Sequence, residues 1–437
     1  MNLVESIRKS GIVGCGGAGF PAHVKAASKA EIVVANGAEC EPLLHKDLEL
    51  MMREPEAIVD GMKLLMSATG AQNGIIGVKK KYEDKVVGIK SALLGTDITI
   101  QFLGDYYPTG DEYVLVYETT KRLIPPQGIP LDVGVVVHNV ETLRNFSLAA
   151  QDRPSITKYI SVAGAVVHPS TFEVPVGISF ADVIEAAGGS TIPDRAIFVS
   201  GIMMGKLETD ATLPITKTCA GLIILPSNHY LVQRKSLTMN AMHHRGKSAC
   251  DQCSFCTEFC PRYVLGYDVQ PHKVMRSLSF TTSGEDLWNQ WAQLCCACGL
   301  CTLYSCPEDL YPKEACDKAK NDLRATGIPW SGTHDVQIHP IYDGRHVPLN
   351  KLIGKLGIGE YNVPAHFVDK KFSPDQVRLP LVQHLGVPSK AVVSVGQQVK
   401  AGDVVAEIPD GKLGARIHAS IDGRVNKVQG EIVVRRE

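Results

Sequence analysis

Eight cysteines in two short runs constrain the fold of this chain more than any other feature of its sequence. The first run reads "CDQCSFCTEFCP" and consists of Cys250, Cys253, Cys256 and Cys260. The second reads "CCACGLCTLYSCP" and contains Cys295, Cys298, Cys301 and Cys306, with one extra residue before its last cysteine. A proline follows the last cysteine of each run. The chain has 13 cysteines and no apolar leader at its N-terminus, so we expect a metal or cluster ligated in a reducing compartment rather than disulfide bonds.

The spacing of the first run, C-x2-C-x2-C-x3-C-P, is that of the two-cluster ferredoxins. In this arrangement three closely spaced thiolates hold one 4Fe-4S cluster, and the cysteine before proline reaches the other cluster. We therefore predict two 4Fe-4S clusters, the first on Cys250, Cys253, Cys256 and Cys306 and the second on Cys295, Cys298, Cys301 and Cys260. Structural zinc, the alternative, usually takes its ligands as two separated pairs. The remaining cysteines are predicted to pack as small apolar side chains: Cys15, Cys40, Cys219, Cys296 and Cys316.

A glycine-rich stretch near the start of the chain, "GIVGCGGAGFPAH", has the spacing G-x-G-x-x-G. A dinucleotide-binding fingerprint needs a strand before this pattern and a helix directly after it. Here a helix-like segment precedes the pattern, and Phe20-Pro21 follows its last glycine. We expect instead a loop whose backbone approaches a phosphate or a ring closely, with Lys25 supplying positive charge. A purely structural turn is the alternative.

This loop, with Lys25, resembles the flavin loop of the NADH-oxidising flavoprotein subunit of respiratory complex I. Three later segments resemble further parts of that family and occur in its order. They are "ANGAECEP" with Asn36, Glu39 and Glu41, "YPTGDEYV" with Gly110, Asp111 and Glu112, and "VVVHNVETL" with His138, Asn139 and Thr142. Ala38 stands where the family usually has aspartate, and Asp111 where it has glutamate. Taken singly, the acidic residues could equally be solvated surface.

The resemblance implies a role for each of these residues. FMN would be held by Gly14, Gly16, Gly17, Gly19, Lys25, Asn36, Glu39, Gly110, His138, Asn139 and Thr142. Phe20 would lie near the nicotinamide of NADH, and the catalytic acidic residues that orient NADH would be Glu41, Asp111 and Glu112. Hydride would then pass to FMN, which can release electrons singly to the clusters.

The pattern along the chain predicts a multidomain protein of α/β and α+β class, as its 437 residues and 44% apolar content allow. Residues 1–150 are predicted to form an α/β domain that binds FMN and NADH, and residues 155–235 a β-grasp (SLBB) domain. Residues 245–328 would form a helical, two-cluster ferredoxin-like domain. A linker, 329–374, would lead to a lipoyl-like barrel-sandwich hybrid domain over residues 375–437.

These domains in this order resemble the cobalamin reductases of propanediol-utilisation microcompartments. The flavoprotein of complex I has a single set of cluster cysteines, and the C subunit of the Rnf complex carries its barrel first. The resemblance implies an NADH-dependent oxidoreductase that reduces cob(III)alamin or cob(II)alamin and so reactivates a corrinoid-dependent diol dehydratase. Two alternatives stay open: a general NADH:acceptor electron-transfer protein like the Rnf C subunit, and a non-catalytic electron-relay scaffold.

The composition and the absence of certain motifs limit the classes of partner that this chain is expected to bind. With 45 basic and 46 acidic residues well mixed, the chain has no electrostatic footprint for nucleic acid. No stretch approaches the roughly 18 apolar residues of a membrane span. No D-x-H-x-x-G corrinoid-ligand pattern occurs, so cobalamin is predicted to be a visiting electron acceptor. The expected partners are NADH, a corrinoid system and a microcompartment shell protein, in the cytoplasm or inside a bacterial microcompartment.

Overall fold

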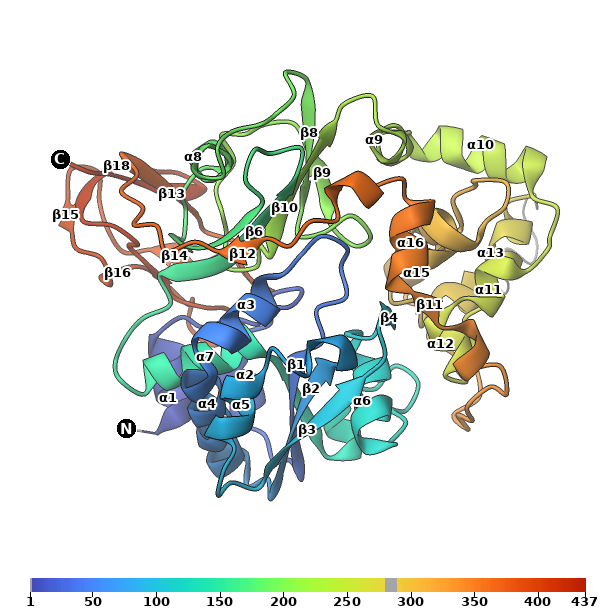
Figure 1. Ribbon diagram of the computed structural model, residues 1–437, viewed down its shortest axis with the longest axis horizontal. Coiled ribbons are helices and arrows are strands. Elements are labelled where there is room, and N and C mark those ends of the chain that lie inside the picture. The colour runs from blue at the N-terminus through green and yellow to red at the C-terminus, as the bar shows by residue number, and fades with distance from the viewer. Residues whose placement is uncertain (1, 280–288) are drawn as a thin grey trace.

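The N-terminal third of the chain folds around a four-stranded parallel sheet of order β3-β2-β1-β5. The computed structural model describes residues 2–279 and 289–437 (Figure 1). The strands of this sheet are β1 (Ile32–Gly37), β2 (Asn73–Lys79), β3 (Ile98–Leu103) and β5 (Val135–Asn139). Runs of β-branched residues such as Val135–Val137 suit strands that are buried on both faces.

Helices cover both faces of this sheet. Val33 and Ala35 of β1 pack in one core with α4 (Pro55–Thr69) and α7 (Val140–Ala149), whereas Val34 packs in another with α6 (Glu112–Thr120). The remaining α-helices described in this domain are α1 (Leu3–Lys9), α2 (Ala22–Ala26), α3 (Lys46–Arg53) and α5 (Val87–Ala92), and two short 3-10 helices are η1 (Lys80–Tyr82) and η2 (Pro130–Val133). Period-2 alternation along β1 thus sorts neighbouring side chains into two layers.

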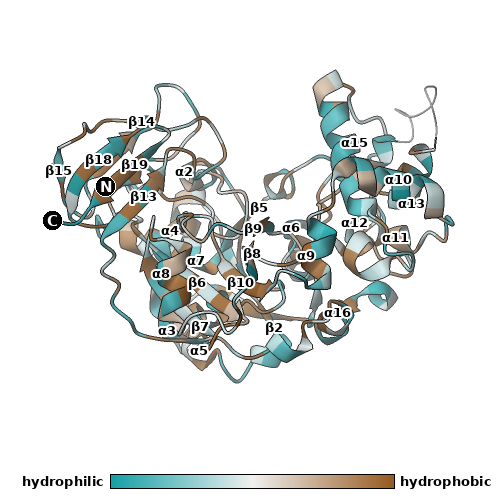
Figure 2. Cartoon of the chain, turned by 90° about the horizontal axis from the view of Figure 1, so that it is seen from above, coloured by the Kyte–Doolittle hydropathy of each residue, from teal (hydrophilic) through white to brown (hydrophobic). Residues whose placement is uncertain are grey.

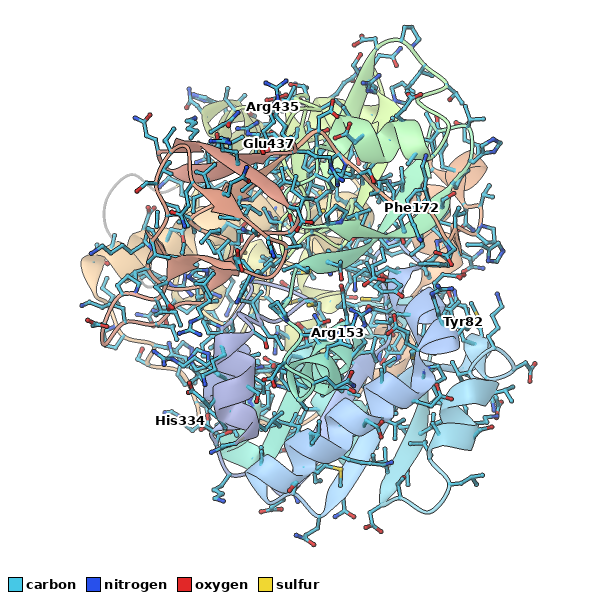
Figure 3. The ribbon with its side chains drawn as sticks, turned by 90° about the vertical axis from the view of Figure 1, so that its left-hand side faces the viewer. Tyr82, Arg153, Phe172, His334, Arg435 and Glu437 are labelled. Carbon is cyan, nitrogen blue, oxygen red and sulfur yellow. The ribbon has the colours of Figure 1, made fainter. Side chains whose placement is uncertain are left out.

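The second sheet has six strands in the order β12-β7-β6-β10-β8-β9. Its strands are β6 (Thr157–Gly164), β7 (Ser170–Pro175), β8 (Arg195–Val199), β9 (Lys206–Glu208), β10 (Gly221–Pro226) and β12 (His366–Phe367). Helix α8 (Phe180–Ala186), which begins behind the N-cap Ser179, packs on this sheet in one apolar core. Figure 3 labels Phe172, a core residue of β7.

The cysteine runs lie in a module of short helices at one end of the molecule (Figure 1). The elements that the structure describes in this module are α9 (Tyr230–Lys235), α10 (Met239–Ala249), α11 (Phe255–Glu258), α12 (Pro261–Val264), α13 (Pro271–Ser277), η3 (Gln290–Ala292), η4 (Cys301–Ser305) and α15 (Pro312–Thr326). Proline opens α12, α13 and α15, where its missing N–H would be unpaired in any case. In Figure 2, α10 and α15 are largely hydrophilic.

The stretch expected as a linker, residues 329–374, is here named the strap, because it contributes strands to two other domains. Its strand β11 (Val347–Pro348) pairs with β4 (Tyr106–Tyr107) beside the first sheet, and β12 pairs with β7 of the second. Helix α16 (Leu349–Lys355) lies between them. The strap therefore joins the N-terminal domain to the six-stranded sheet.

The C-terminal strands form two small antiparallel sheets around one core, at the end opposite the cysteine module (Figures 1 and 2). One has the order β13-β19-β18-β15 and the other β14-β16-β17. Their bounds are β13 (Gln376–Pro380), β14 (Lys390–Ala391), β15 (Gln398–Val399), β16 (Val404–Glu407), β17 (Ile417–His418), β18 (Gly423–Val428) and β19 (Glu431–Arg435). Val176, which follows β7, belongs to the same core, so this barrel packs against the second domain.

Candidate functional site

The candidate flavin site lies at the carboxyl edge of the parallel sheet. After β1 the chain adds β2 and β3 on one side, whereas β5 lies on the other side of β1. In open parallel sheets such a switch point opens a crevice outside the carboxyl ends of the strands, where ligands bind. Asn36 of β1 and Asn139 of β5 are register partners at this edge. The segments "ANGAECEP" and "VVVHNVETL" therefore lie side by side there.

The glycine loop covers this edge. Val13 and Pro21 form an isolated β-bridge, and the Gly14 amide donates to the Phe20 carbonyl over 2.9 Å. The loop therefore follows a helix, α1, rather than the strand of a dinucleotide fingerprint, and the five-residue α2 begins only after Phe20-Pro21. The Cys15 amide donates to Thr142 Oγ1 over 3.0 Å and fixes the loop to α7.

Three glycines of the loop differ in their surroundings. A Cβ on Gly16 would lie 3.1 Å from the Cβ of Asn139, which shows how closely the loop approaches β5. Gly19 has φ 71° and a Cβ there would meet Thr218 at 2.6 Å. A Cβ on Gly17 would have no protein atom within 4 Å. Gly17 thus borders open space that a phosphate or a ring can fill.

Polar contacts bring the four predicted flavin segments together. Lys25 Nζ lies 3.0 Å from Glu112 Oε1 and donates to the Val137 carbonyl over 3.3 Å. Asn36 Nδ2 donates to the Gly110 carbonyl over 2.9 Å. His138 is buried, and its Nε2 has no hydrogen-bond partner within the described residues. Burial and the charge of Lys25 hold its pKa well below the ordinary value, which favours the neutral imidazole.

The sequence did not single out a buried group of charges beneath this edge. Asn139 Nδ2 donates to Asp47 Oδ2 over 2.8 Å, and Asp47 is in turn paired with Lys46. Lys46 Nζ lies 3.1 Å from Glu141, which also pairs with Lys158. The signal was available as charged residues at the starts of α3 and α7, where apolar residues would otherwise face the core. These pairs fix the orientation of the Asn139 amide.

Glu39 lies next to this group. Its Oε2 accepts from the Asp47 amide over 3.1 Å. Burial, together with the negative charge of Asp47, raises the pKa of Glu39 to about 8. Burial and the Asp47 carboxylate thus favour the protonated form of Glu39.

The three acidic residues assigned to NADH point to three different partners. Glu112 pairs with Lys25 near the glycine loop. Asp111 caps α6 and lies 3.0 Å from Arg262 of the cysteine module. Glu41 accepts from the amides of Met203 and Met204 over 3.1 and 2.8 Å, so it joins the β8–β9 connection. The structure brings Glu112 to the flavin segments but does not bring Glu41 together with it, and their roles stay predictions.

Thiols from both cysteine runs surround one pocket. Its lining includes the four thiols assigned to the first cluster: Cys250, Cys253, Cys256 and Cys306. All other lining residues also come from the range 251–312. Among residues 2–279 and 289–437, no three Cys, His, Asp or Glu side chains are arranged for a single metal ion. Thiols around a pocket suit a cluster of several metal atoms, and their ligation stays a prediction.

The thiols assigned to the second cluster also lie together. Burial raises the pKa of Cys301, and the neighbouring Cys295, Cys256 and Cys260 thiols raise it further. Cys298 is likewise surrounded by thiols, among them Cys301 and Cys260. The last cysteine of each run is thus placed with the other run. Cys296, expected to pack as an apolar residue, lies beside Cys260 and Cys298.

Family models account for most of the chain. The Nuo51 FMN-binding domain matches residues 7–147, the SLBB domain 159–206, the 4Fe-4S dicluster domain 249–311, and the RnfC barrel sandwich hybrid domain 363–436. The predicted fold class is therefore confirmed. In the described part of the chain, no helix has the length and apolarity needed to cross a membrane.

Two of the curated relatives match over nearly their full length, and a third matches over a little more than half. Cobalamin reductase PduS of Salmonella typhimurium is 38% identical over 430 residues, which cover 98% of this chain and 95% of that protein. Cobalamin reductase PduS of Citrobacter freundii is 36% identical, over 97% and 94% respectively. The C subunit of the proton-translocating ferredoxin:NAD(+) oxidoreductase complex of Clostridium ljungdahlii is 32% identical, over 60% of this chain and 56% of that protein. The chain is thus a flavin and iron-sulfur oxidoreductase that belongs to the cobalamin reductase PduS family.

Proposed function

We propose that this chain oxidises NADH and passes the electrons singly to cob(III)alamin or cob(II)alamin. The observation that carries the proposal is the meeting of the four flavin segments at the switch point between β1 and β5, beside the open space at Gly17. The names of the full-length relatives support cobalamin as the acceptor. Bound FMN would accept a hydride and release electrons one at a time.

The residues at the switch point are suited to an anionic, planar ligand. Backbone N–H groups of the glycine loop and the ammonium of Lys25 would bind phosphate or ring oxygens. His138 and the Asn139 amide, which Asp47 and Glu141 hold in place, would form the polar base of the crevice. Burial and Asp47 raise the pKa of Glu39, and its Oε2 accepts from the Asp47 amide, so Glu39 would act as a neutral group beside the crevice. Phe20, Asp111 and Glu112 would position the nicotinamide.

The eight cysteines of the two runs would hold two 4Fe-4S clusters as thiolates. Cys250, Cys253, Cys256 and Cys306 would ligate the first, and Cys260, Cys295, Cys298 and Cys301 the second. We further propose a corrinoid enzyme system and a microcompartment shell protein as partners, and the interior of a microcompartment as the location. These follow from the family resemblance.

A general NADH:acceptor electron-transfer protein is the second candidate function. It is favoured by the similarity to the Rnf-type C subunit over 60% of the chain and by the absence of a D-x-H-x-x-G pattern from the sequence.

Anaerobic stopped-flow mixing separates the two candidates. NADH is mixed with the holoprotein while flavin absorbance is followed, and the reduced protein is then mixed with cob(III)alamin, cob(II)alamin or ferredoxin. We expect NADH to bleach the flavin faster than NADPH does, and cobalamin to reoxidise the protein. Bound FMN that NADH leaves oxidised would exclude NADH dependence. Reoxidation by ferredoxin alone would establish the general electron-transfer protein.

A further inference from the structure

The second cysteine run is built onto the N-terminal domain. The Tyr107 hydroxyl, in the segment "YPTGDEYV", donates to the Cys298 carbonyl over 2.7 Å, and both residues are buried. They share an apolar core with Met203 of the second domain. The pocket of the first run has no such contact, because only residues 250–312 line it within the described chain. The thiols assigned to the second cluster are therefore the ones next to the flavin segments.

Arg262 crosses the same boundary. It belongs to α12 and follows Cys260 by two residues. Its Nη2 lies 3.0 Å from Asp111 Oδ2, and its guanidinium carbon lies 3.4 Å from the centre of the Tyr113 ring. Only 9% of its side chain is exposed, against 13% for Asp111. This arginine is thus a buried cation held by one carboxylate and one aromatic face.

Two nitrogens of Arg262 have no oxygen or nitrogen partner among the residues that the structure describes. Nε and Nη1 are buried and find no oxygen or nitrogen acceptor within the described chain, although buried donors are rarely left unpaired. The thiol beside the guanidinium is that of Cys296, which makes a side-chain hydrogen bond with Arg262. Cys296 in turn lies beside Cys260 and Cys298. The N–H groups of Arg262 therefore lie beside the second cysteine set.

We propose that Arg262 is a positioning residue for the second cluster, and that its Nε–H and Nη1–H groups donate to sulfur atoms there while Asp111 fixes its orientation. This proposal rests on the proposed function, because it requires a cluster on Cys260, Cys295, Cys298 and Cys301. Reduction adds one electron and thus one negative charge to a cluster. A fixed cation and N–H donors at sulfur favour the reduced form, so Arg262 raises the reduction potential of this cluster.

The test is a redox titration of the purified holoprotein, followed by EPR. The second cluster is identified as the signal that Cys298→Ala removes. We expect Arg262→Gln to weaken reduction of that cluster at least tenfold, which is a shift of about 59 mV to lower potential for one electron. Arg262→Lys keeps the charge but not the planar fork, so its shift should be smaller. The reduction potential of the first cluster should stay unchanged in both variants.

Asp111→Asn provides a test of opposite sign. Asparagine can still cap α6, but it removes the negative charge that faces Arg262. The second cluster should therefore shift to higher potential. Arg245→Gln is the matched control, because Arg245 lies exposed on α10 in the same module, and both potentials should stay at the wild-type values.

Three outcomes would overturn the proposal: a wild-type potential in both Arg262 variants, equal shifts of both clusters, or the same sign for Arg262→Gln and Asp111→Asn. If Arg262→Gln loses the cluster, Arg262→Lys and Asp111→Asn decide between support and rejection by the same criteria. Failure of the proposed function is distinguishable, since it would leave wild-type protein without two EPR signals or with a flavin that NADH cannot reduce.

Discussion

Gly17 is the residue at which flavin binding and cluster binding can be separated. An added Cβ at this position would have no protein atom within 4 Å beyond its chain neighbours, so we expect a valine there to cost the fold little. It would instead fill the space in which the ligand must lie. We expect Gly17→Val to weaken FMN binding at least tenfold, about 1.4 kcal/mol, while iron per chain stays unchanged. Dithionite should still bleach the clusters, whereas NADH should not.

Gly344→Val is the control for this prediction, because Gly344 also has no atom within 4 Å of an added Cβ and lies in the strap. It should keep FMN. Full FMN content in Gly17→Val, combined with lost NADH binding, would show that the loop serves the dinucleotide instead.

The last cysteine of each run gives a second residue-scale prediction. Because Cys306 lines the pocket of the first run and Cys260 lies among the thiols of the second, each alanine variant should disturb the cluster of the opposite run. Cys260→Ala should change the EPR signal of the second cluster and leave that of the first. Loss of the first cluster alone in Cys260→Ala would contradict the exchange of ligands.

At the scale of elements, the one extra residue of the second run changes the type of helical turn that precedes its last cysteine. In the first run the residues before the last cysteine form the α-helical turn α11. In the second, Cys301–Ser305 form a π-helix, η4. A π-helical turn closes around one more residue than an α-helical turn. The insertion is thus absorbed within the turn, and Cys306 still precedes its proline.

This difference predicts an asymmetry between two deletions. Removing Tyr304, which is only partly buried, would restore the spacing of the first run, so both clusters should survive in iron and EPR measurements. Removing Glu258 from the first run leaves no extra residue to absorb the change, and a cluster should be lost. Survival of both clusters in the Glu258 deletion would mean that spacing does not control assembly.

The sequence predicted the elements that depend on local chemistry better than those that depend on distant pairing. Ligation of a cluster requires closely spaced thiols, so the two cluster-binding runs could be predicted from the spacing of their cysteines. The contact of Asp111 with Arg262 spans 151 residues, and no local pattern encodes it. The two-residue strands β11 and β12 are too short for alternation to reveal them. The contacts of Glu41 could not be predicted from the local sequence either, since its partners lie in the next domain.

At the scale of the whole molecule, three domains meet at Lys217. Its Nζ donates to the carbonyls of Gly11 and Arg416 over 2.6 and 2.8 Å. The Gly11 carbonyl belongs to the N-terminal domain and the Arg416 carbonyl to the C-terminal barrel. In Figure 3 the barrel, marked by Arg435 and Glu437, lies above the N-terminal helices. Burial lowers the pKa of Lys217 to about 7. A neutral amine keeps two N–H groups, enough for both carbonyls.

This arrangement predicts that stability depends on pH. The unfolded lysine has a pKa of about 10.4, so between about pH 7 and 10 the unfolded chain binds more protons, and stability rises with pH by at most about 1.4 kcal/mol per unit. Burial lowers the pKa of the facing His384 and His418 and raises that of Cys15, so these groups stay neutral through most of this window. Arg416 remains charged throughout.

Melting temperatures of wild type and Lys217→Met test this prediction when they are measured at about pH 7 and at about pH 9, because both conditions lie within the window in which only the unfolded lysine is fully protonated. The melting temperature of the wild type should rise relative to that of Lys217→Met as the pH increases. Lys206→Met is the control, since Lys206 is exposed on β9, and it should follow the wild type. A difference between wild type and Lys217→Met that does not change with pH would contradict the assignment.

During synthesis on the ribosome, the six-stranded sheet can be completed only late, because its edge strand β12 belongs to the strap. β7 ends at Pro175, but its outer neighbour β12 begins at His366, so about 190 residues are added between them. At about 5–20 residues per second this takes on the order of 10–40 s. During that interval the nascent chain presents an unpaired strand edge, where another strand can bind. The interval ends only when synthesis reaches His366, after both cysteine runs have already emerged.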